Sequence, residues 1–322
     1  MKKQFSVLLF IAVALFASGC AKTAESFDSQ QIDNGYNNSL AGGNMAYINN
    51  SLYLVYNSGD VLNIGTYKIN NNGVECILEN AEADYIFTAP RLYQYNNQLY
   101  SVDCDKSAVL KYDSTEKKFL LSEFSIKPCS DKVYISDDLL VWYSDTEGTL
   151  NVKYKNSNEY TLDKQVYSYY VSDNVIYFMD CNGWLYSNDV TSGGDSKFIN
   201  KLNDYSTEIM SVCNGYCYYT YDGNNLSDYK SGLYRYSFTD DKSELILEKE
   251  VFGLNTYDDK MYIASESGIY ADNGSNCQKF SDIVTKEIYI LDNEWIYTND
   301  NSGNIFRISI DKNSVERINF TP

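Results

Sequence analysis

The stretches DDKMYIASESGIYA (258–271), DNEWIYTNDNSGNIFRI (292–308) and DNVIYFMDCNGWLYS (173–187) share a two-part pattern. In each, an Asn/Asp-rich pair precedes a Tyr-containing hydrophobic segment. About nine residues later, a glycine precedes a second hydrophobic and aromatic segment. The pattern recurs seven times along the chain. Repetition at a fixed period is typical of solenoids and propellers.

The period of this repeat indicates the architecture. The residues at the aromatic position of the first segment lie 35 to 47 residues apart, with a mean of about 41. They are Tyr53, Tyr100, Val141, Tyr177, Tyr218, Tyr262 and Tyr297. Four-stranded propeller blades repeat at about 40–45 residues. The segments alternate Tyr, Ile, Val and Phe with polar residues and are separated by Asn, Asp and Gly, as strands are. We therefore expect an all-β, seven-bladed β-propeller. Six blades, at about 46 residues each, are the alternative.

The last copy predicts one complete blade. Its strands are expected at 286–291, 294–299, 304–310 and 314–320. Tight hairpins are expected at the turn pairs because Asn and Asp tolerate positive φ, and Asn-Gly favours it most. The pairs are Asn49-Asn50, Asn96-Asn97, Asp137-Asp138, Asp173-Asn174, Asn214-Gly215, Asp258-Asp259 and Asp292-Asn293.

The N-terminus has the features of a secretion signal. Lys2 and Lys3 precede an uncharged apolar segment, 5–18, which is short for a membrane span. The segment ends in Ala17-Ser18-Gly19-Cys20, which resembles a bacterial lipobox. The resemblance implies a signal peptide at 1–20 and lipid on Cys20; an ordinary signal with a chance cysteine is the alternative.

Two further regions follow the predicted signal. The polar, Gly- and Asn-containing residues 21–44 are expected to form a flexible stalk. Residues 45–322 are expected to form the propeller. The protein is then a monomer at the bacterial cell envelope, lipid-anchored and facing outside the cytoplasm.

Composition excludes several classes of function. The formal charge of −18 disfavours nucleic acid as a partner. The chain contains no histidine, which removes Ser-His-Asp and Cys-His catalysis and His-ligated metal sites. The seven cysteines besides Cys20 are odd in number and form no CxxC pair. We expect mostly free thiols, buried as small hydrophobic side chains.

The turns between the second and third strands of the blades are expected to lie on one face of the disc. Each copy places a carboxylate there, so this face is predicted to be acidic. The residues are Asp60, Asp103, Asp105, Asp145, Glu147, Asp180, Asp222, Asp228, Glu266 and Asp300. Such a face could bind Ca²⁺, a basic partner or a sugar. The alternative is that Asp is simply a common β-turn residue.

One of these turns, 221–232, is about six residues longer than the others. Loops on a rigid scaffold often carry binding residues. Its aromatic and amide content makes it a candidate binding loop, with a tolerated surface insertion as the alternative. The candidate residues are Tyr221, Asn224, Asn225, Tyr229 and Lys230.

SGLYRYSF (231–238) resembles bacterial propellers of unknown function that are related to low-density-lipoprotein-receptor-type propellers. The YWTD tetrapeptide of the receptor group is absent, so the resemblance implies the fold and no activity. We expect a binding or scaffold propeller that recognises a protein, peptide or glycan, with no cofactor except Ca²⁺. The alternatives are a carbohydrate-active enzyme that uses carboxylates of the acidic face, and an assembly-factor propeller.

Overall fold

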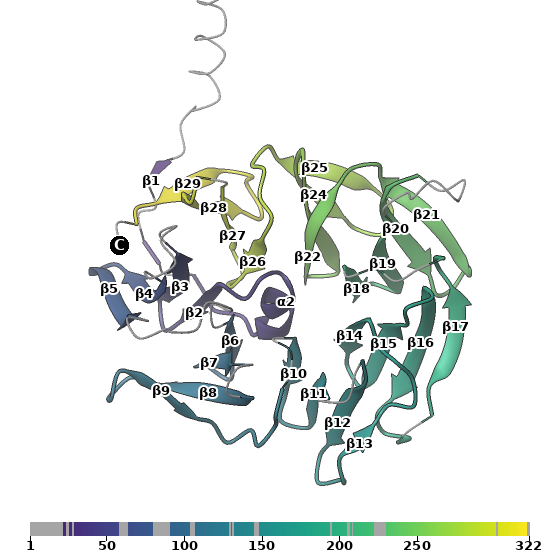
Figure 1. Cartoon of the computed structure of the whole chain (residues 1–322). Coiled ribbons are helices and arrows are strands. Elements are labelled where there is room, and N and C mark those ends of the chain that lie inside the picture. The colour runs from purple at the N-terminus through teal and green to yellow at the C-terminus, as the bar shows by residue number, and fades with distance from the viewer. Residues whose placement is uncertain are drawn as a thin grey trace, which may run out of the picture.

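The computed structural model describes residues 22, 23, 26, 27, 29–57, 64–79, 91–103, 107–128, 130, 132–144, 148–193, 195–204, 207, 209–221, 230–300 and 302–320. These residues form a ring of seven blades, each of four antiparallel strands, and a short parallel strand is added to the sheet of the last blade (Figure 1). A short helix lies near the middle of the ring. The predicted seven-bladed β-propeller is confirmed. The predicted signal peptide and Cys20 lie outside the described residues.

The strands of each blade follow chain order from the centre of the ring outwards. Blade 1 contains β2 (Met45–Ile48), β3 (Ser51–Asn57), β4 (Ile64–Asn70) and β5 (Gly73–Glu79). Blade 2 contains β6 (Arg91–Tyr95), β7 (Gln98–Asp103), β8 (Ala108–Asp113) and β9 (Lys118–Leu121). Blade 3 contains β10 (Val133–Ile135), β11 (Leu139–Tyr143), β12 (Leu150–Tyr154) and β13 (Tyr160–Thr161).

The remaining four blades repeat this order. Blade 4 contains β14 (Ser168–Ser172), β15 (Val175–Met179), β16 (Trp184–Asp189) and β17 (Lys197–Lys201). Blade 5 contains β18 (Met210–Cys213), β19 (Tyr216–Tyr221), β20 (Gly232–Ser237) and β21 (Lys242–Leu247). Blade 6 contains β22 (Val251–Tyr257), β23 (Lys260–Ser265), β24 (Gly268–Asp272) and β25 (Cys277–Ser281). Blade 7 contains β26 (Ile288–Ile290), β27 (Trp295–Asn299), β28 (Ile305–Ser309) and β29 (Val315–Ile318), close to the four predicted ranges.

The repeated aromatic position lies in the second strand of each blade, where it packs between blades. Tyr218, Tyr262 and Tyr297 are at most 2 % exposed. The repeated glycine opens the third strand. At Gly232 and Gly268 φ is 149° and 124°, and a Cβ would lie 2.3 Å from a carbonyl oxygen of the fourth strand. The glycine is therefore needed where the fourth strand comes close.

The predicted hairpin joins the first and second strands of all seven blades, but the expected positive φ occurs in only five of them. Positive φ occurs at Asn49-Asn50, Asn96-Asn97, Asp173, Asn214-Gly215 and Asp258-Asp259. It does not occur at Asp137-Asp138 or Asp292-Asn293. In blade 3, Ser136 Oγ accepts the Leu139 N–H at 3.0 Å. In blade 7, Asp292 Oδ1 accepts the Glu294 and Trp295 N–H groups at 2.9 and 2.8 Å. Side-chain hydrogen bonds to the backbone thus form these turns without left-handed residues.

The four strands of blade 7, β26 to β29, come from the C-terminal end of the chain, and an N-terminal strand is added to the outer edge of the same sheet. The N-terminal residues 26, 27 and 29–33, here named the closure segment, join blades 7 and 1. The short strand β1 (Lys22–Thr23) runs parallel to β29 at the rim (Figure 1). The Phe27 N–H donates to Asn71 of blade 1 at 3.0 Å. Ser29 Oγ donates to Asp292 of blade 7 at 2.9 Å.

After the closure segment the chain forms helix α2 (Gly35–Leu40) inside the ring (Figure 1). Just before the helix, Asn34 Nδ2 donates to the Thr256 carbonyl, near the end of inner strand β22. Near the helix end, the Ser39 carbonyl accepts a hydrogen bond from Arg91, at the start of inner strand β6. Starts and ends of the inner strands lie on opposite faces of the disc, so α2 passes through the central channel from one face to the other.

For residues 29–44, the expectation of a flexible stalk over 21–44 is corrected by this arrangement. Asn38 Nδ2 donates to the Ile290 carbonyl at 2.8 Å, and Asn38 Oδ1 accepts the Ile290 N–H at 2.8 Å and Asn255 Nδ2 at 2.9 Å. The polar residues that indicated a solvated segment are therefore partners of inner-strand backbone groups. A Cβ at Gly35 would lie 1.8 Å from the Gln94 carbonyl oxygen, which explains the glycine there.

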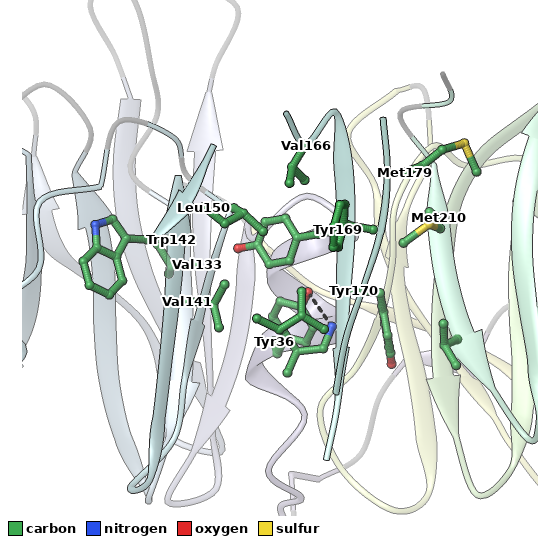
Figure 2. Close-up of a cluster of buried hydrophobic side chains, with 14 of the residues drawn as sticks. Tyr36, Val133, Val141, Trp142, Leu150, Val166, Tyr169, Tyr170, Met179 and Met210 are labelled. Atoms are coloured by element: carbon green, nitrogen blue, oxygen red, sulfur yellow. Dashed lines mark hydrogen bonds between the residues drawn. The ribbon is translucent and has the colours of Figure 1, made fainter. Parts of the chain in front are cut away.

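Tyr36 of α2 extends the hydrophobic core into the channel. Figure 2 shows its ring beside Tyr169 and Tyr170 of blade 4, with side chains of blade 3 nearby. The Tyr36 hydroxyl accepts the Val171 N–H at 3.2 Å. Burial raises the pKa of Tyr36 well above its ordinary value. The helix is thus held by apolar packing as well as by hydrogen bonds.

The cysteines that the structure describes form no disulfide, as expected: Cys76, Cys181, Cys213, Cys217 and Cys277. The expected burial is wrong for most of them, since only Cys217 is buried, and Cys76 and Cys181 are exposed. Cys104 and Cys129 lie outside the described residues. A search of the described residues finds no helix that is long and apolar enough to cross a membrane.

Candidate functional site

Two of the predicted acidic-face residues form their own turns. Asp180 Oδ1 accepts the N–H groups of Asn182 and Trp184 at 2.8 and 3.0 Å. Asp300 Oδ1 accepts those of Ser302 and Asn304, both at 2.9 Å. Part of the acidic pattern is therefore accounted for by turn formation.

The other predicted acidic residues are placed only in part. Glu266 lies 3.8 Å from Lys249, and Asp103 ends β7. The other carboxylates of that face lie outside the described residues: Asp60, Asp105, Asp145, Glu147, Asp222 and Asp228. Within the described part of the chain, no three His, Cys, Asp or Glu side chains form a group that could hold a metal ion. Binding of Ca²⁺ stays a prediction.

The candidate loop is described only at its two ends. Tyr221 is 5 % exposed, and its ring packs edge-on against Tyr234. Lys230 Nζ lies 2.8 Å from Glu248 Oε2 in an exposed ion pair. Tyr221 therefore belongs to the core of blade 5. Asn224, Asn225 and Tyr229 lie outside the described residues.

The structure brings a different set of residues together, between blades 2 and 3. A cavity of about 540 Å³, here called the groove, opens there. Its volume lies within the range of about 300–1,000 Å³ that is common for small-molecule sites. The hairpins 95–98 and 136–140 and the third strands β8 and β12 line it, together with Glu123 and Phe124 of the β9–β10 connection. A smaller cavity of about 290 Å³ shares Gln98 and Lys111 with it.

Two tyrosine–carboxylate hydrogen bonds organise this groove. The Tyr95 hydroxyl donates to Asp137 Oδ1 at 2.6 Å, and Asn96 Nδ2 donates to the same oxygen at 3.1 Å. The Tyr100 hydroxyl donates to Glu123 Oε1 at 2.8 Å. Burial and the neighbouring carboxylate raise the pKa of both Tyr95 and Tyr100. The phenols therefore stay neutral donors at physiological pH, and they hold the two carboxylates in place.

Cations complete the lining. Lys111 Nζ lies 3.5 Å from Glu123 Oε1 and 5.6 Å from the centre of the Tyr100 ring. Burial opposes ionisation of Glu123, but hydrogen bonds from the backbone and Tyr100, together with Lys111, lower the pKa of Glu123 overall. Lys155 lies 3.7 Å from Asp138. The groove thus presents fixed hydrogen-bond donors and acceptors of both signs of charge.

Aromatic surface adjoins these polar groups. The Phe124 ring lies 6.2 Å from Tyr95 and 5.3 Å from Tyr100, centre to centre. Tyr95 and Phe124 are both partly exposed. The combination of aromatic rings and preorganised polar groups is suited to recognition of a polar ligand.

Sequence reasoning did not identify this groove. Its Asp137-Asp138 and Asn96-Asn97 pairs were noted only as turns, on the face opposite to the predicted acidic one. Glu123 and Phe124 lie in a connection with no repeated pattern. An available signal was Lys153, a lone cation on the third strand of blade 3, but its role depends on which residue of the preceding blade lies opposite it.

Comparison with solved structures finds propellers. The extracellular domain of BT4673 from B. thetaiotaomicron is 13 % identical over 91 % of this chain and 40 % of that chain, with a TM-score of 0.51. The computationally designed protein Ika8 is 11 % identical over 89 % of each chain, with a TM-score of 0.53. PorZ, a surface component of the type-IX secretion system of Porphyromonas gingivalis, is 16 % identical over 86 % of this chain and 39 % of that chain, with a TM-score of 0.48.

These similarities concern the fold alone. The chain spans about two fifths of the length of the two bacterial proteins. No protein-family model matches the sequence, and no curated protein matches it.

Proposed function

We propose that this chain is a binding or scaffold propeller of the bacterial cell envelope, which recognises a protein, peptide or glycan outside the cytoplasm. The observation that carries this proposal is the preformed groove of about 540 Å³ between blades 2 and 3. Its carboxylates are held by the Tyr95 and Tyr100 hydroxyls before any ligand arrives. Preorganisation of this kind lowers the entropic cost of binding.

Attachment to the membrane forms the second part of the proposal. The apolar segment 5–18 and the lipobox-like Ala17-Ser18-Gly19-Cys20 support lipid on Cys20. Intact-mass measurement of the full chain expressed in a bacterial envelope should give a processed, acylated N-terminus at Cys20. The Cys20→Ala variant should lack the acyl mass. A wild-type chain that is cleaved but carries no lipid would exclude the tether and leave the binding role standing.

The binding role is tested by presenting the detergent-purified full chain to arrays of glycans, peptides and envelope proteins. We expect saturable binding of one class and no turnover in a product assay. Turnover that is lost on replacement of one acidic-turn carboxylate would establish the carbohydrate-active enzyme instead. A folded chain that binds none of the three classes would contradict the proposal.

A further inference from the structure

Four blades carry a cation at the same place in the third strand, directly opposite the aromatic position of the second strand. The pairs in register are Tyr53–Lys68, Tyr100–Lys111, Tyr218–Arg235 and Tyr297–Arg307. Two of these cations, Arg235 and Lys111, approach the junction with the following blade. The two cations differ in the charge of the residue that the following blade places opposite them.

The junction between blades 5 and 6 is closed by a buried ion pair. Arg235 Nη1 reaches both carboxylate oxygens of Asp272 in blade 6, at 3.0 and 2.8 Å. The Tyr218 hydroxyl donates to the same carboxylate at 2.8 Å. The Asp272 side chain is fully buried and the Arg235 side chain is 9 % exposed. The cation of one blade is thus paired with a carboxylate of the next blade, and its Nε also donates to Glu244 of its own blade.

The junction between blades 2 and 3 reverses one of these charges. Asp272 stands opposite Met261, one residue before the aromatic position. In blade 3 the same register places Lys153 opposite Leu140. Lys111 and Lys153 both line the groove, so a lysine of blade 2 faces a lysine of blade 3 where the other junction has an Arg–Asp pair. Like charges cannot close the junction as the ion pair does.

Most other charges in the groove are already partnered. Glu123 accepts from Tyr100 and lies near Lys111, and Asp138 lies near Lys155. Lys153 is exposed and forms no ion pair with a residue that the structure describes. The groove therefore offers an ammonium group for an anion, beside carboxylate oxygens that can still accept hydrogen bonds.

We propose that this groove binds a sugar acid, with the ligand carboxylate between Lys111 and Lys153 and ligand hydroxyls donating to Asp137. The proposal rests on the proposed binding function and names its ligand class. Asn96 and Gln98 supply amide groups for further hydroxyls. The partly exposed rings of Tyr95 and Phe124 supply apolar surface for the C–H face of a pyranose ring.

The mixed lining distinguishes a sugar acid from simpler anions. Inorganic phosphate or sulfate needs donors and cations only, and Asp137 and Glu123 would repel it. A neutral sugar leaves Lys153 unneutralised. A sugar acid satisfies both kinds of group, because its hydroxyls donate and its carboxylate accepts. An acidic peptide supplies a carboxylate and backbone N–H donors, but it has no pyranose face to pack on the rings of Tyr95 and Phe124.

The test is calorimetric titration of the full chain with uronic-acid trisaccharides, with neutral trisaccharides of the same linkage, and with an aspartate-containing tripeptide. We expect the best uronic-acid ligand to bind at least ten times more tightly than its neutral counterpart. Lys153→Glu should weaken that binding at least tenfold. The matched control is Lys242→Glu, which makes the same charge change on exposed outer strand β21 and should leave binding unchanged. Near-ultraviolet circular dichroism checks that each variant is folded.

Several results would overturn the inference. They are equal affinity for acidic and neutral trisaccharides, binding that survives Lys153→Glu, binding of the tripeptide alone, and no binding of any trisaccharide by the folded chain. A ligand found on the arrays and retained by Lys153→Glu would remove this site while the general binding role stands. Absence of any array ligand would remove both.

Discussion

The junctions between blades 5 and 6 and between blades 2 and 3 are built from the same three kinds of group. Each has a second-strand tyrosine, a third-strand cation and a carboxylate that accepts the tyrosine hydroxyl. The groups are Tyr218, Arg235 and Asp272 in one, and Tyr100, Lys111 and Glu123 in the other. The first carboxylate is fully buried, whereas the second is 54 % exposed.

The difference lies in where the carboxylate comes from. Asp272 belongs to the next blade, so its bond to Arg235 draws two blades together. Glu123 belongs to the connection that leaves its own blade, and the next blade contributes Lys153 in its place. The two junctions thus differ in the sign of the charge at one register position, which is Asp272 at the closed junction and Lys153 at the open groove.

The comparison is tested most severely by removal of the two carboxylates. Asp272→Ala should lower the free energy of unfolding by about 3 kcal/mol, because the largely buried guanidinium of Arg235 loses its buried partner and keeps only the half-exposed Glu244. Glu123→Ala should cost at most about 1 kcal/mol, since its ion pair is exposed. Urea denaturation measures both changes.

The double variant Arg235→Met/Asp272→Leu is the control, because it removes the two buried charges together. It should recover most of the lost stability. Equal losses in Asp272→Ala and Glu123→Ala would refute the distinction between the two junctions.

Thiol chemistry should report how tightly the blade 5–6 junction is closed. Burial raises the pKa of Cys213 to about 12, with contributions from Asp259 and Asp272, and burial raises that of Cys277 to about 12. Because only the thiolate reacts, iodoacetamide at pH 8 should label both about a hundredfold or more slowly than exposed Cys181. Mass spectrometry of timed digests gives the rates. Rapid labelling of Cys213 in the native chain would mean that this junction opens readily.

Replacement of Lys153, which makes the blade 2–3 junction resemble the blade 5–6 junction, should change the free energy of unfolding less. Lys153→Asp places a carboxylate where blade 6 has Asp272, facing Lys111. The new pair is partly exposed, so the gain in unfolding free energy should be at most about 1 kcal/mol. The same variant should lose affinity for uronic-acid trisaccharides. Unchanged affinity together with higher stability would show that Lys153 faces blade 2 but takes no part in binding.

The smallest expected change in stability is the pH dependence due to Asp292, at the junction of blades 7 and 1. Burial raises the pKa of Asp292 above its ordinary value of 3.8, against hydrogen bonds from Tyr297 and Ser29 that lower it. The folded chain therefore holds this proton more tightly than the unfolded chain, and stability should fall as pH rises from about 4 through the raised pKa. Asp292→Asn abolishes this titration, so its stability relative to the wild type should rise with pH across that window. Thermal melts between pH 4 and 7 measure the difference, and a flat difference would contradict the raised pKa.

The blades were predictable because their signals are local. Tyr218 and Gly268 recur at one period, and each acts within its own blade or on the adjoining strand. The role of residues 29–44 was not predictable in this way. Asn38 looks like a loop residue, and its partners Ile290 and Asn255 are more than 200 positions away.

The groove was hidden for a related reason. Lys153 is an ordinary surface lysine until it is placed opposite Lys111 of another blade. Two of the acidic-turn residues were visible in the pattern but serve locally, as the hydrogen bonds of Asp180 and Asp300 to their own turns show. The repeated residues therefore predict the blades. The binding residues are those that differ between copies, and they can be recognised only when neighbouring blades are compared.

Strand β1 also determines how far the disc can move from a membrane. If Cys20 carries lipid, only residue 21 separates the anchor from Lys22, which is paired with Glu316 of β29. A segment of that length reaches about 7 Å even when it is fully extended. The propeller would then stand with its β1–β29 rim toward the lipid surface. The junction of blades 2 and 3, which lies in the half of the ring away from that rim, would point away from the lipid surface (Figure 1).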